Sequence, residues 1–430
     1  MIVNILFVVN FMDKTENYEV KDIALAEQGK LNIEFAEAHM PLMAKIKERM
    51  EKEKPFEGLT IGLALHITKE TAVLVKTLAA GGAKVAVASC NPLSTQDDVA
   101  AALAKEGFHV YGYKGENNDE YYRYIDAVIS HKPDITIDDG CDLVSTIHTK
   151  HADMIGKLIG GCEETTTGII RLHAMAKDNA LKYPVIAVND NKTKHMLDNY
   201  YGTGQSAIDG LLRATNILIA GKTFVVGGYG DCGKGVAMRA KGMGANVVVT
   251  EVNAFRAMQA VLDGYRVMPV SDAAKIGDIF LTVTGDKHVI TTEHVKHMKN
   301  GAILANAGHF DNEIDVSGMN EKWKKRRIRP FLDEYEVDEK KIYLAAEGRL
   351  VNLGAAEGHP SEVMATSFAG QTLACEYLVK NKGKLEAKVI TLPEEIDNEI
   401  AELQLEVMGV KKDKLTKEQE KYLSSWEEGT

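Results

Sequence analysis

A glycine turn in mid-chain is the clearest candidate for chemistry in this sequence. The stretch 225–235 reads VVGGYGDCGKG, in which Gly228, Gly230 and Gly233 form the pattern G-x-G-x-x-G. In such a turn the first glycine permits the bend, the second lets a pyrophosphate approach the backbone, and the third lets helix and strand pack closely. The N-terminus of the following helix then faces the phosphates. The pattern predicts a dinucleotide site.

The surroundings of the glycine turn favour NAD as the dinucleotide. The turn lies between an apolar run, KTFVV, and a helical pattern, and Glu251 ends the next strand-like run, NVVVTE. An acidic residue about 20 positions after the first glycine is typical of dinucleotide sites. Because a carboxylate there accepts from both ribose hydroxyls and repels a 2′-phosphate, we expect NAD and not NADP. A P-loop is excluded, since Gly235 stands where Ser or Thr must bind magnesium.

The elements that must position such residues alternate between strand and helix patterns. Apolar runs of strand length (LTIGLALHIT, AKVAVASC, FHVYGY, DITIDD and YPVIAVND) alternate with helical patterns such as KETAVLVKTLAAGG and TQDDVAAALAKEG. Strands apolar on both faces imply a parallel sheet covered by helices on both sides. Ligands bind beyond the carboxyl ends of such strands. Six residues lie at these ends: His66, Thr68, Asn91, Asp138, Asp139 and Asp190.

Length and composition limit the class of protein. A chain of 430 residues exceeds one ordinary core, so we expect two or three domains. The formal net charge of -11 argues against nucleic acid or an anionic membrane as a partner. No apolar run approaches the roughly 20 residues of a membrane span. The cysteines follow no disulfide or metal spacing, which favours a reducing cytoplasm: Cys90, Cys141, Cys162, Cys232 and Cys375.

Two other patterns are weaker candidates for function. The histidine pairs His148/His151 and His294/His297 have no third ligand at a metal spacing, so we interpret them as solvated and expect no metal. The basic run KWKKRR at 322–327 is interpreted as a solvated helix face in an acidic protein.

Eight stretches taken together resemble the S-adenosylhomocysteine hydrolase family, in family order. They are LHITKETA, SCNPLSTQDD, DDGCDL, EETTTG, NDNKTKHMLDNYYG, GYGDCGKG, AGHFDNEID and GRLVNLGAAEGHPSEVM. The resemblance runs from about Tyr18 to Tyr422. It implies an α/β fold with a doubly wound parallel-sheet substrate domain at 18–190 and 358–391, an inserted Rossmann NAD-binding domain at 191–357, and a C-terminal interface segment at 392–430. A homo-oligomer, dimer or tetramer, is implied as well.

The family chemistry explains why a hydrolase would need NAD. The implied reaction is the reversible hydrolysis of S-adenosyl-L-homocysteine to adenosine and homocysteine. The thioether is a poor leaving group, and the 4′ C–H is scarcely acidic. Oxidation of the 3′-hydroxyl makes that C–H acidic, homocysteine is eliminated, water adds to the enone, and the ketone is reduced again. NAD is therefore expected to stay bound and to be regenerated in every turnover.

The resemblance assigns roles residue by residue. Lys194 and Asp198, at i, i+4 on one helical face, match the pair that binds the 3′-hydroxyl and assists its deprotonation. A lysine does this best when a dry site lowers its pKa. Asp139 and Glu164 match the ribose and proton-transfer carboxylates. The remaining catalytic matches are His66 and His309, near the 5′ carbon, and the purine matches are Thr68, Glu70, His359 and Met364.

The implied NAD contacts come from seven separate stretches. They are Thr165, Thr166, Thr167, Asn199, Gly228, Gly230, Asp231, Cys232, Gly233, Lys234, Gly235, Glu251, Thr284, Ala307, Gly308, His309 and Asn352.

Three departures from the family pattern bear on cofactor and substrate. Thr203 stands where the family often has a cysteine near the nicotinamide, and the chain ends YLSSWEEGT without the usual Lys- and Tyr-bearing tail. In the purine pocket, Lys69 and Glu357 replace apolar residues. An added ammonium suits O6 of hypoxanthine, so S-inosyl-L-homocysteine is an alternative substrate. The competing interpretation is that Lys69 and Glu357 point to solvent.

Two other classes of function stay open at this point. A plain NAD-dependent dehydrogenase would release NADH and would need neither the Lys194/Asp198 pair nor EETTTG. A catalytically inactive NAD-binding relative should have lost matched catalytic residues, and none is missing here.

The start of the chain gives a first testable prediction. The resemblance begins near Tyr18, and the stretch MIVNILFVVNF before Met12 is apolar and uncharged. We interpret 1–17 as an extension or a misassigned start, because an exposed apolar segment promotes aggregation. A chain beginning at Met12 should fold, bind NAD and turn over normally in a steady-state assay. Loss of stability or activity would instead make the segment part of the substrate domain.

Overall fold

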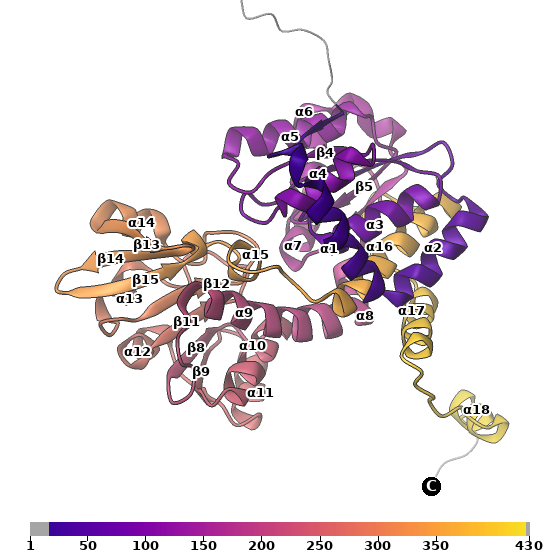
Figure 1. The fold of residues 1–430 in the computed structure, drawn as a ribbon. Coiled ribbons are helices and arrows are strands. Elements are labelled where there is room, and N and C mark those ends of the chain that lie inside the picture. Colours follow the sequence, from indigo (N-terminus) through magenta and orange to yellow (C-terminus); the bar gives the residue numbers. More distant parts are fainter. Residues whose placement is uncertain (1–16, 427–430) are drawn as a thin grey trace, which may run out of the picture.

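The computed structural model describes residues 17–426, which form two lobes, each built on its own sheet (Figure 1). The first sheet has eight parallel strands in the order β1-β4-β3-β2-β5-β6-β7-β16. The order reverses between β2 and β5, which makes that crevice a topological switch point. The strands are β1 (Tyr18–Glu19), β2 (Thr60–Ala64), β3 (Lys84–Ala88), β4 (His109–Tyr111), β5 (Ile135–Asp138), β6 (Gly160–Glu163), β7 (Val185–Ala187) and β16 (Val389–Ile390).

Helices cover both faces of the first sheet, which confirms the predicted doubly wound arrangement. One core packs the sheet against α1 (Ala26–Ala38), α2 (Pro41–Glu53), α3 (Lys69–Ala80), α4 (Asp97–Lys105) and α16 (Ser361–Lys380). The opposite core contains α5 (Asn118–Ser130), α6 (Asp142–Lys150) and α7 (Thr166–Lys177). Short 3-10 turns complete the lobe: η1 (Ile23–Leu25), η2 (Ala152–Lys157) and η3 (Val188–Asp190).

Helix α3 shows how local sequence sets the first lobe. Thr68 caps its N-terminus by accepting from the amide of Thr71, and Gly81 follows its last turn. The cap fixes the chain just after β2, where His66 leaves the sheet. Thr68, which the family resemblance assigns to the purine pocket, thus also caps the helix.

The second sheet also has eight strands, in the order β10-β9-β8-β11-β12-β15-β14-β13. The first six are parallel, and β14 and β13 form an antiparallel edge. The switch point lies between β8 and β11. The strands are β8 (Thr223–Gly227), β9 (Asn246–Thr250), β10 (Arg266–Val267), β11 (Ile279–Thr282), β12 (Ile303–Asn306), β13 (Lys324–Arg329), β14 (Leu332–Val337) and β15 (Lys340–Ala345).

The second sheet is likewise covered on both faces, as a Rossmann fold requires. One core contains α9 (Thr203–Thr215), α10 (Asp231–Gly242), α11 (Ala254–Leu262) and α15 (Val351–Gly354). The other contains α12 (Val270–Ile276), α13 (Thr292–His297) and α14 (Val316–Lys322). The turn η5 (Ala346–Gly348) precedes α15.

Two chain segments join the lobes. The first runs through α8 (Lys192–Lys194) and the π-helical segment η4 (His195–Gly202) into α9, so Lys194 and Asp198 lie where a short helix passes into a π-helix. The second returns from α15 to α16. Beyond β16, α17 (Glu394–Val407) packs on α2, α8 and α16, whereas α18 (Lys417–Ser424) stands away from both lobes (Figure 1).

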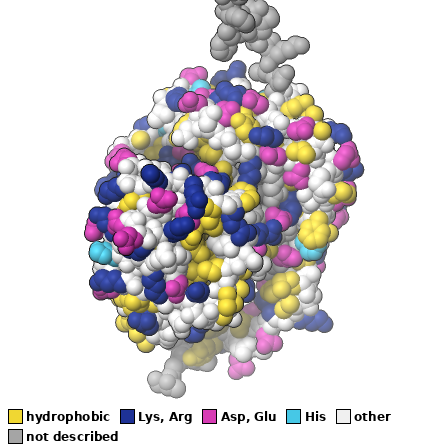
Figure 2. Space-filling model, turned by 60° about the vertical axis from the view of Figure 1, so that its left-hand side comes forward, with side chains coloured by type: hydrophobic (Ala, Val, Ile, Leu, Met, Phe, Trp, Pro, Cys, Tyr) yellow, Lys and Arg dark blue, Asp and Glu magenta, His cyan; other side chains and the backbone are white. Residues whose placement is uncertain are grey.

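The basic run is solvated, but only Lys322, the last residue of α14, is helical, so the prediction of a helix is wrong for the rest of the run. Residues 324–329 form the exposed edge strand β13. Arg326 and Arg327 lie opposite Glu334 and Asp333 on β14 and form ion pairs with them. These cross-strand pairs stabilise the edge and neutralise part of its charge. On the face that Figure 2 shows, basic and acidic side chains are likewise interspersed.

Two further sequence-based expectations concern the start of the chain and membrane-spanning segments. The proposed start at Met12 lies outside the described residues. Within residues 17–426, no helix combines the length and the apolar character that crossing a bilayer requires.

Close contact between α10 and η4 gives a second prediction. A Cβ on Gly235 would lie 1.9 Å from the carbonyl oxygen of Tyr200, so Gly235→Ala must push η4 away from α10. The variant should lose about 2 kcal/mol of stability or more and bind NAD more weakly. Gly242→Ala, on the same helix with no atom within 4 Å, is the control and should be neutral or slightly stabilising. Equal melting temperatures for the two variants would contradict this packing.

Candidate active site

A cavity of about 1230 Å³ lies between the two lobes. Its lining comes from residues just beyond the carboxyl ends of β2, β5, β6 and β7 in the first lobe and of β8, β9, β11 and β12 in the second. The two topological switch points therefore open onto one space, as expected for ligand sites in parallel sheets. Of the six strand-end residues singled out from the sequence, Asn91 and Asp138 lie outside this lining.

Nearly all of the predicted site residues line this cavity. From the first lobe, the connections and the adjoining helix α15 come His66, Thr68, Glu70, Asp139, Glu164, Thr165, Thr166, Thr167, Lys194, Asp198, Asn199, Asn352, His359 and Met364. From the second lobe come Gly228, Gly230, Asp231, Cys232, Glu251, Thr284, Ala307, Gly308 and His309. Three predicted cofactor contacts do not line it: Gly233, Lys234 and Gly235.

The ammonium of Lys194 is the centre of the most buried charged cluster in the cavity. Its Nζ lies 3.3 Å from Asp198 Oδ1 and 3.7 Å from Glu164 Oε1, and the three side chains are at most 7% exposed. Nζ also donates to Asn199 Oδ1 at 2.9 Å. On the far side of Asp198, His359 Nδ1 lies 3.3 Å away. These side chains form one continuous polar cluster.

The expectation that a dry site lowers the pKa of Lys194 is wrong. Burial by itself would lower it, but the carboxylates of Asp198 and Glu164 outweigh burial and raise the pKa. Burial likewise opposes ionisation of Asp198, yet Lys194 and His359 hold its pKa below the usual range. Burial raises the pKa of Glu164 to about 7, despite the opposing effect of Lys194. Glu164 is thus the member that can exchange a proton near neutral pH.

Asp139 lies between two histidines in a second charged group of the cavity. His66 Nε2 is 3.3 Å from Asp139 Oδ2, and His309 Nδ1 is 3.5 Å from Asp139 Oδ1. Burial lowers the pKa of His66 to about 4, although Asp139 opposes that shift. A neutral imidazole beside a carboxylate can accept a proton. His309 comes from the second lobe, so this group is complete only when both lobes contribute.

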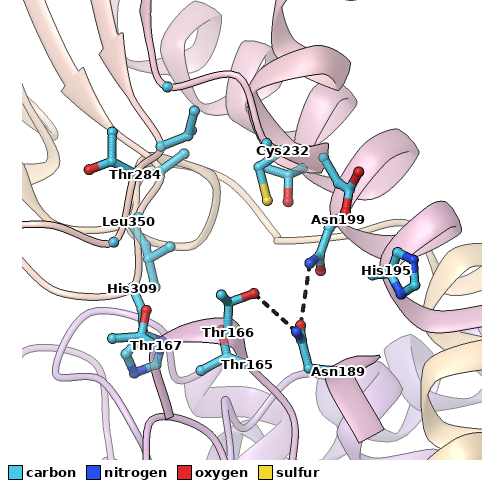
Figure 3. Close-up of a pocket in the computed structure, with 18 of the residues that line it drawn as sticks. Thr165, Thr166, Thr167, Asn189, His195, Asn199, Cys232, Thr284, His309 and Leu350 are labelled. Atoms are coloured by element: carbon cyan, nitrogen blue, oxygen red, sulfur yellow. Dashed lines mark hydrogen bonds between the residues drawn. The ribbon is translucent and has the colours of Figure 1, made fainter. Parts of the chain in front are cut away.

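Asn189 is a site residue that the sequence interpretation missed. Its Nδ2 donates to Thr166 Oγ1 at 3.0 Å, and its Oδ1 accepts from Lys194 and from Asn199 at 3.3 Å each. Figure 3 shows Asn189 between Thr166 and Asn199, with the two hydrogen bonds dashed. The rule that ligands bind at strand ends singled out Asp190, which directly follows Asn189. The prediction therefore missed the hydrogen-bonding residue by one position.

The second-lobe side of the cavity fits a dinucleotide. Gly228 has φ +104, and a Cβ there would lie 2.9 Å from Thr284 Cγ2. Gly230 caps α10 without a side-chain hydrogen bond, so no capping side chain competes for the first-turn amides. The buried Oδ1 of Asn352 has no hydrogen-bond partner among the described residues. Free helix amides suit a pyrophosphate, and an unpartnered buried acceptor suits the nicotinamide carboxamide.

The carboxylate of Glu251 is held in place by backbone amides at the end of β9. Its Oε2 accepts from Tyr229 at 2.8 Å, and its Oε1 accepts from Val252 and Asn253 at 2.7 and 2.8 Å. The carboxylate lies in the cavity lining beside the glycine turn. Arg256, which sequence reasoning also missed, lies beside Gly230 in the same lining.

Near Glu70 and His359, which are predicted to contact the purine, Lys69 does not point to solvent. Its side chain is 12% exposed, and Nζ lies 3.4 Å from Glu70 Oε1 and 3.0 Å from Glu357 Oε2. Glu70 is buried, lines the cavity, and accepts from Ser361 Oγ at 2.6 Å. Glu357 is more exposed and is also paired with Arg213. A cation therefore lies directly behind the buried carboxylate of the predicted purine pocket.

The raised pKa of Glu164 gives a third prediction. The folded protein holds this proton up to about pH 7, whereas the reference carboxyl ionises near 4.5, so ionisation of Glu164 costs stability as pH rises through that window. Glu164→Gln cannot ionise. Its melting temperature relative to wild type should therefore rise between about pH 5 and pH 8. The exposed Glu362→Gln is the control, and a difference between Glu164→Gln and wild type that is independent of pH would refute the assignment.

Two family profiles match the chain. The profile described as S-adenosyl-L-homocysteine hydrolase matches residues 17–156, and the profile described as S-adenosyl-L-homocysteine hydrolase, NAD binding domain, matches residues 199–358. The second match confirms NAD as the predicted cofactor and covers the glycine turn.

Curated relatives are similar over nearly their full length. The S-inosyl-L-homocysteine hydrolase of Methanocaldococcus jannaschii is 60% identical over 414 residues, which cover 96% of this chain and 100% of that protein. The adenosylhomocysteinase of Saccharolobus solfataricus is 58% identical over 417 residues, with 96% and 100% covered. The S-inosyl-L-homocysteine hydrolase of Methanococcus maripaludis is 56% identical over 412 residues, with 96% and 99% covered. The chain therefore belongs to the S-adenosyl-L-homocysteine hydrolase family.

Proposed function

We propose that the protein catalyses the reversible hydrolysis of an S-nucleosyl-L-homocysteine thioether to a nucleoside and homocysteine. The first candidate substrate is S-adenosyl-L-homocysteine. The observation that carries the proposal is the single cavity that joins a dinucleotide turn to two buried acid–base groups, Lys194/Asp198/Glu164 and Asp139/His66/His309. A plain dehydrogenase needs only one such group, and an inactive relative needs neither.

The Lys194 cluster suits the 3′-hydroxyl of the substrate ribose. Because Lys194 is held as an ammonium, it can donate to the 3′-oxygen and stabilise negative charge there. Glu164, with a pKa of about 7, can take the hydroxyl proton and return it. Asp198 stays ionised and holds Lys194 in place. The glycine turn and Asn352 would hold NAD, which would supply a reversible hydride acceptor for the 3′ carbon.

The Asp139 group suits the 4′ and 5′ carbons. Once the 3′ carbon is a ketone, the 4′ proton is acidic enough for a carboxylate such as Asp139 to remove. His66 and His309 flank Asp139, so a proton can be given to the leaving sulfur and taken from the incoming water on the same side.

A second candidate substrate is S-inosyl-L-homocysteine, and the position of Lys69 favours it. Hypoxanthine presents a donor at N1 and an acceptor at O6, whereas adenine presents an acceptor at N1 and a donor at N6. Glu70 can accept from either base, but the adjacent ammonium of Lys69 suits only O6. Two of the most similar relatives carry the inosyl name.

We also propose a homo-oligomer, dimer or tetramer, in the cytoplasm. Helix α18 stands away from both lobes and exposes Leu423 and, beyond its end, Trp426. Apolar side chains on a projecting arm are typical of a segment that packs on a neighbouring subunit. The described cysteines are all free, which suits a reducing compartment. The domain limits 18–190 with 358–391, 191–357 and 392–430 are part of this proposal.

Removal of the Lys194 ammonium is the direct test of the proposed chemistry. Lys194→Ala should lower turnover by at least about 1000-fold, because it removes charge stabilisation at the 3′-oxygen. In a single-turnover mixture the absorbance of bound NADH should not appear. Lys192→Ala, an exposed lysine in the same short helix, should behave as wild type. Bound NADH formed at the normal rate by the Lys194 variant would refute the role.

Base preference gives the fifth prediction. The wild type should cleave the inosyl thioether with a kcat/KM about tenfold above that of the adenosyl thioether, because Lys69 favours O6. Lys69→Val with Glu357→Met should lower the inosyl value and spare the adenosyl value. Glu336→Met, an exposed glutamate on β14, controls for loss of charge alone. Equal losses for both thioethers would exclude Lys69 as a determinant of the base.

A further inference from the structure

Two buried carboxyls, Asp138 and Glu163, lie behind the site and are used by none of the steps above. They are register partners on the adjacent parallel strands β5 and β6, and both are completely buried. Adjacent strands lie about 4.8 Å apart, and side chains in register point to the same face. The two carboxyls therefore lie side by side, away from solvent.

In each of these carboxyls, one oxygen accepts hydrogen bonds and the other has no hydrogen-bond partner among the described residues. Glu163 Oε1 accepts from the amides of Gly140 at 2.9 Å and Thr165 at 3.0 Å. Asp138 Oδ2 accepts from the amide of Val144 at 2.8 Å. Glu163 Oε2 and Asp138 Oδ1 have no hydrogen-bond partner among the described residues. A proton held between the two side chains would satisfy both oxygens, because the hydroxyl of one can donate to the other.

The groups that face the pair do not favour two negative charges. Burial raises the pKa of Asp138 to about 8 and that of Glu163 well above its usual range. Arg171 on α7 is the nearby cation, and it is already bound to Asp142 at 2.7 Å. The other titratable groups that interact with the pair are Cys90, Tyr121, Asp139, Cys141, Asp142, Cys162 and Tyr183. Two adjacent carboxyls in such surroundings cannot both ionise.

Glu163 is placed to hold the two proposed catalytic carboxylates. Its Oε1 accepts hydrogen bonds from two backbone amides, that of Gly140, which follows Asp139, and that of Thr165, which follows Glu164. Gly140 has φ +108, and a Cβ there would lie 2.4 Å from His309 Nε2. A Cβ on Gly168 of α7 would lie 2.2 Å from Glu163 Cδ. The carboxyl is thus closely packed, and its displacement would move Asp139 and Glu164 together.

We propose that Asp138 and Glu163 are a positioning pair that retains one shared proton, and that Glu163 fixes Asp139 and Glu164 through the amides of Gly140 and Thr165. The positioning part rests on the proposed function of Asp139 and Glu164. The shared proton does not depend on that function.

Amide substitutions test the shared proton. Glu163→Gln and Asp138→Asn each replace one carboxyl by a neutral group with one acceptor and a permanent donor. Each single variant should keep kcat within about threefold of wild type and should melt near the wild-type temperature. The double variant places two donors face to face with no acceptor, so its melting temperature should fall by far more than the sum of the single effects. A tolerated double variant, or single variants that melt much higher than wild type, would overturn the shared proton.

Infrared spectroscopy detects the proton directly, through the C=O stretch of a protonated carboxyl. At neutral pH the wild type should show a protonated carboxyl C=O band that disappears in Glu163→Gln. Glu116→Gln is the matched control, since Glu116 is another buried carboxyl, bonded to Ser89 and Tyr113 and outside the cavity. It should leave both the Glu163 band and kcat unchanged. Absence of a band that Glu163→Gln removes would overturn the proposal.

Glu163→Met tests positioning, because methionine keeps the size of the side chain and removes the acceptor. The variant should lose about 100-fold in kcat for the nucleosyl thioether, with KM within about threefold and NAD still bound. An unchanged kcat would overturn the positioning role, and rescue by Glu163→Gln would support it. If the wild type cleaves no nucleosyl thioether, the function fails, while the band and the melting temperatures still decide the shared proton.

Discussion

The buried ammonium of Lys194 is the interaction on which the rest of the site depends. A positive charge that is almost fully removed from water is tolerated only beside opposite charges and hydrogen-bond acceptors. Glu164 arrives from the end of β6, Asp198 from the π-helical segment, and Asn189 from the end of β7. The first sheet and the connection between the lobes must therefore be correctly placed relative to each other for the charge of Lys194 to be compensated. The same requirement leaves Glu164, and not Lys194, as the group that titrates near neutral pH.

The two parallel sheets explain why a redox turn lies in the middle of the chain. Each sheet presents its topological switch point to the same cavity, with substrate-type residues on one side and the glycine turn on the other. His309 reaches Asp139 across this space from beyond β12. In the proposed reaction, the second lobe thus completes the acid–base site with His309 and brings a dinucleotide to the 3′ carbon of a nucleoside.

Much of this organisation can be predicted from the sequence, because apolar runs and glycine caps are local signals. The sequence pattern does not predict strand β6, because Gly160–Glu163 is short, begins with two glycines and ends in a carboxylate. The helix predicted for the basic run 322–327 is wrong beyond Lys322 because the partners of its arginines lie on β14, which local charge patterning cannot show. The raised pKa of Lys194 also depends on groups from other elements. The roles of Asn189 and of the Asp138/Glu163 pair follow from contacts between strands and from burial, which a single sequence does not show.

In the proposed reaction, oxidation at the 3′ carbon is temporary and serves to acidify the 4′ proton. The most direct measurement is turnover of the nucleosyl thioether in deuterium oxide, with homocysteine, NADH absorbance and the 4′ position of the nucleoside followed together. The account predicts released homocysteine, deuterium at the 4′ carbon and no net accumulation of NADH. Homocysteine released without deuterium at that carbon, or NADH formed in proportion to substrate, would contradict it.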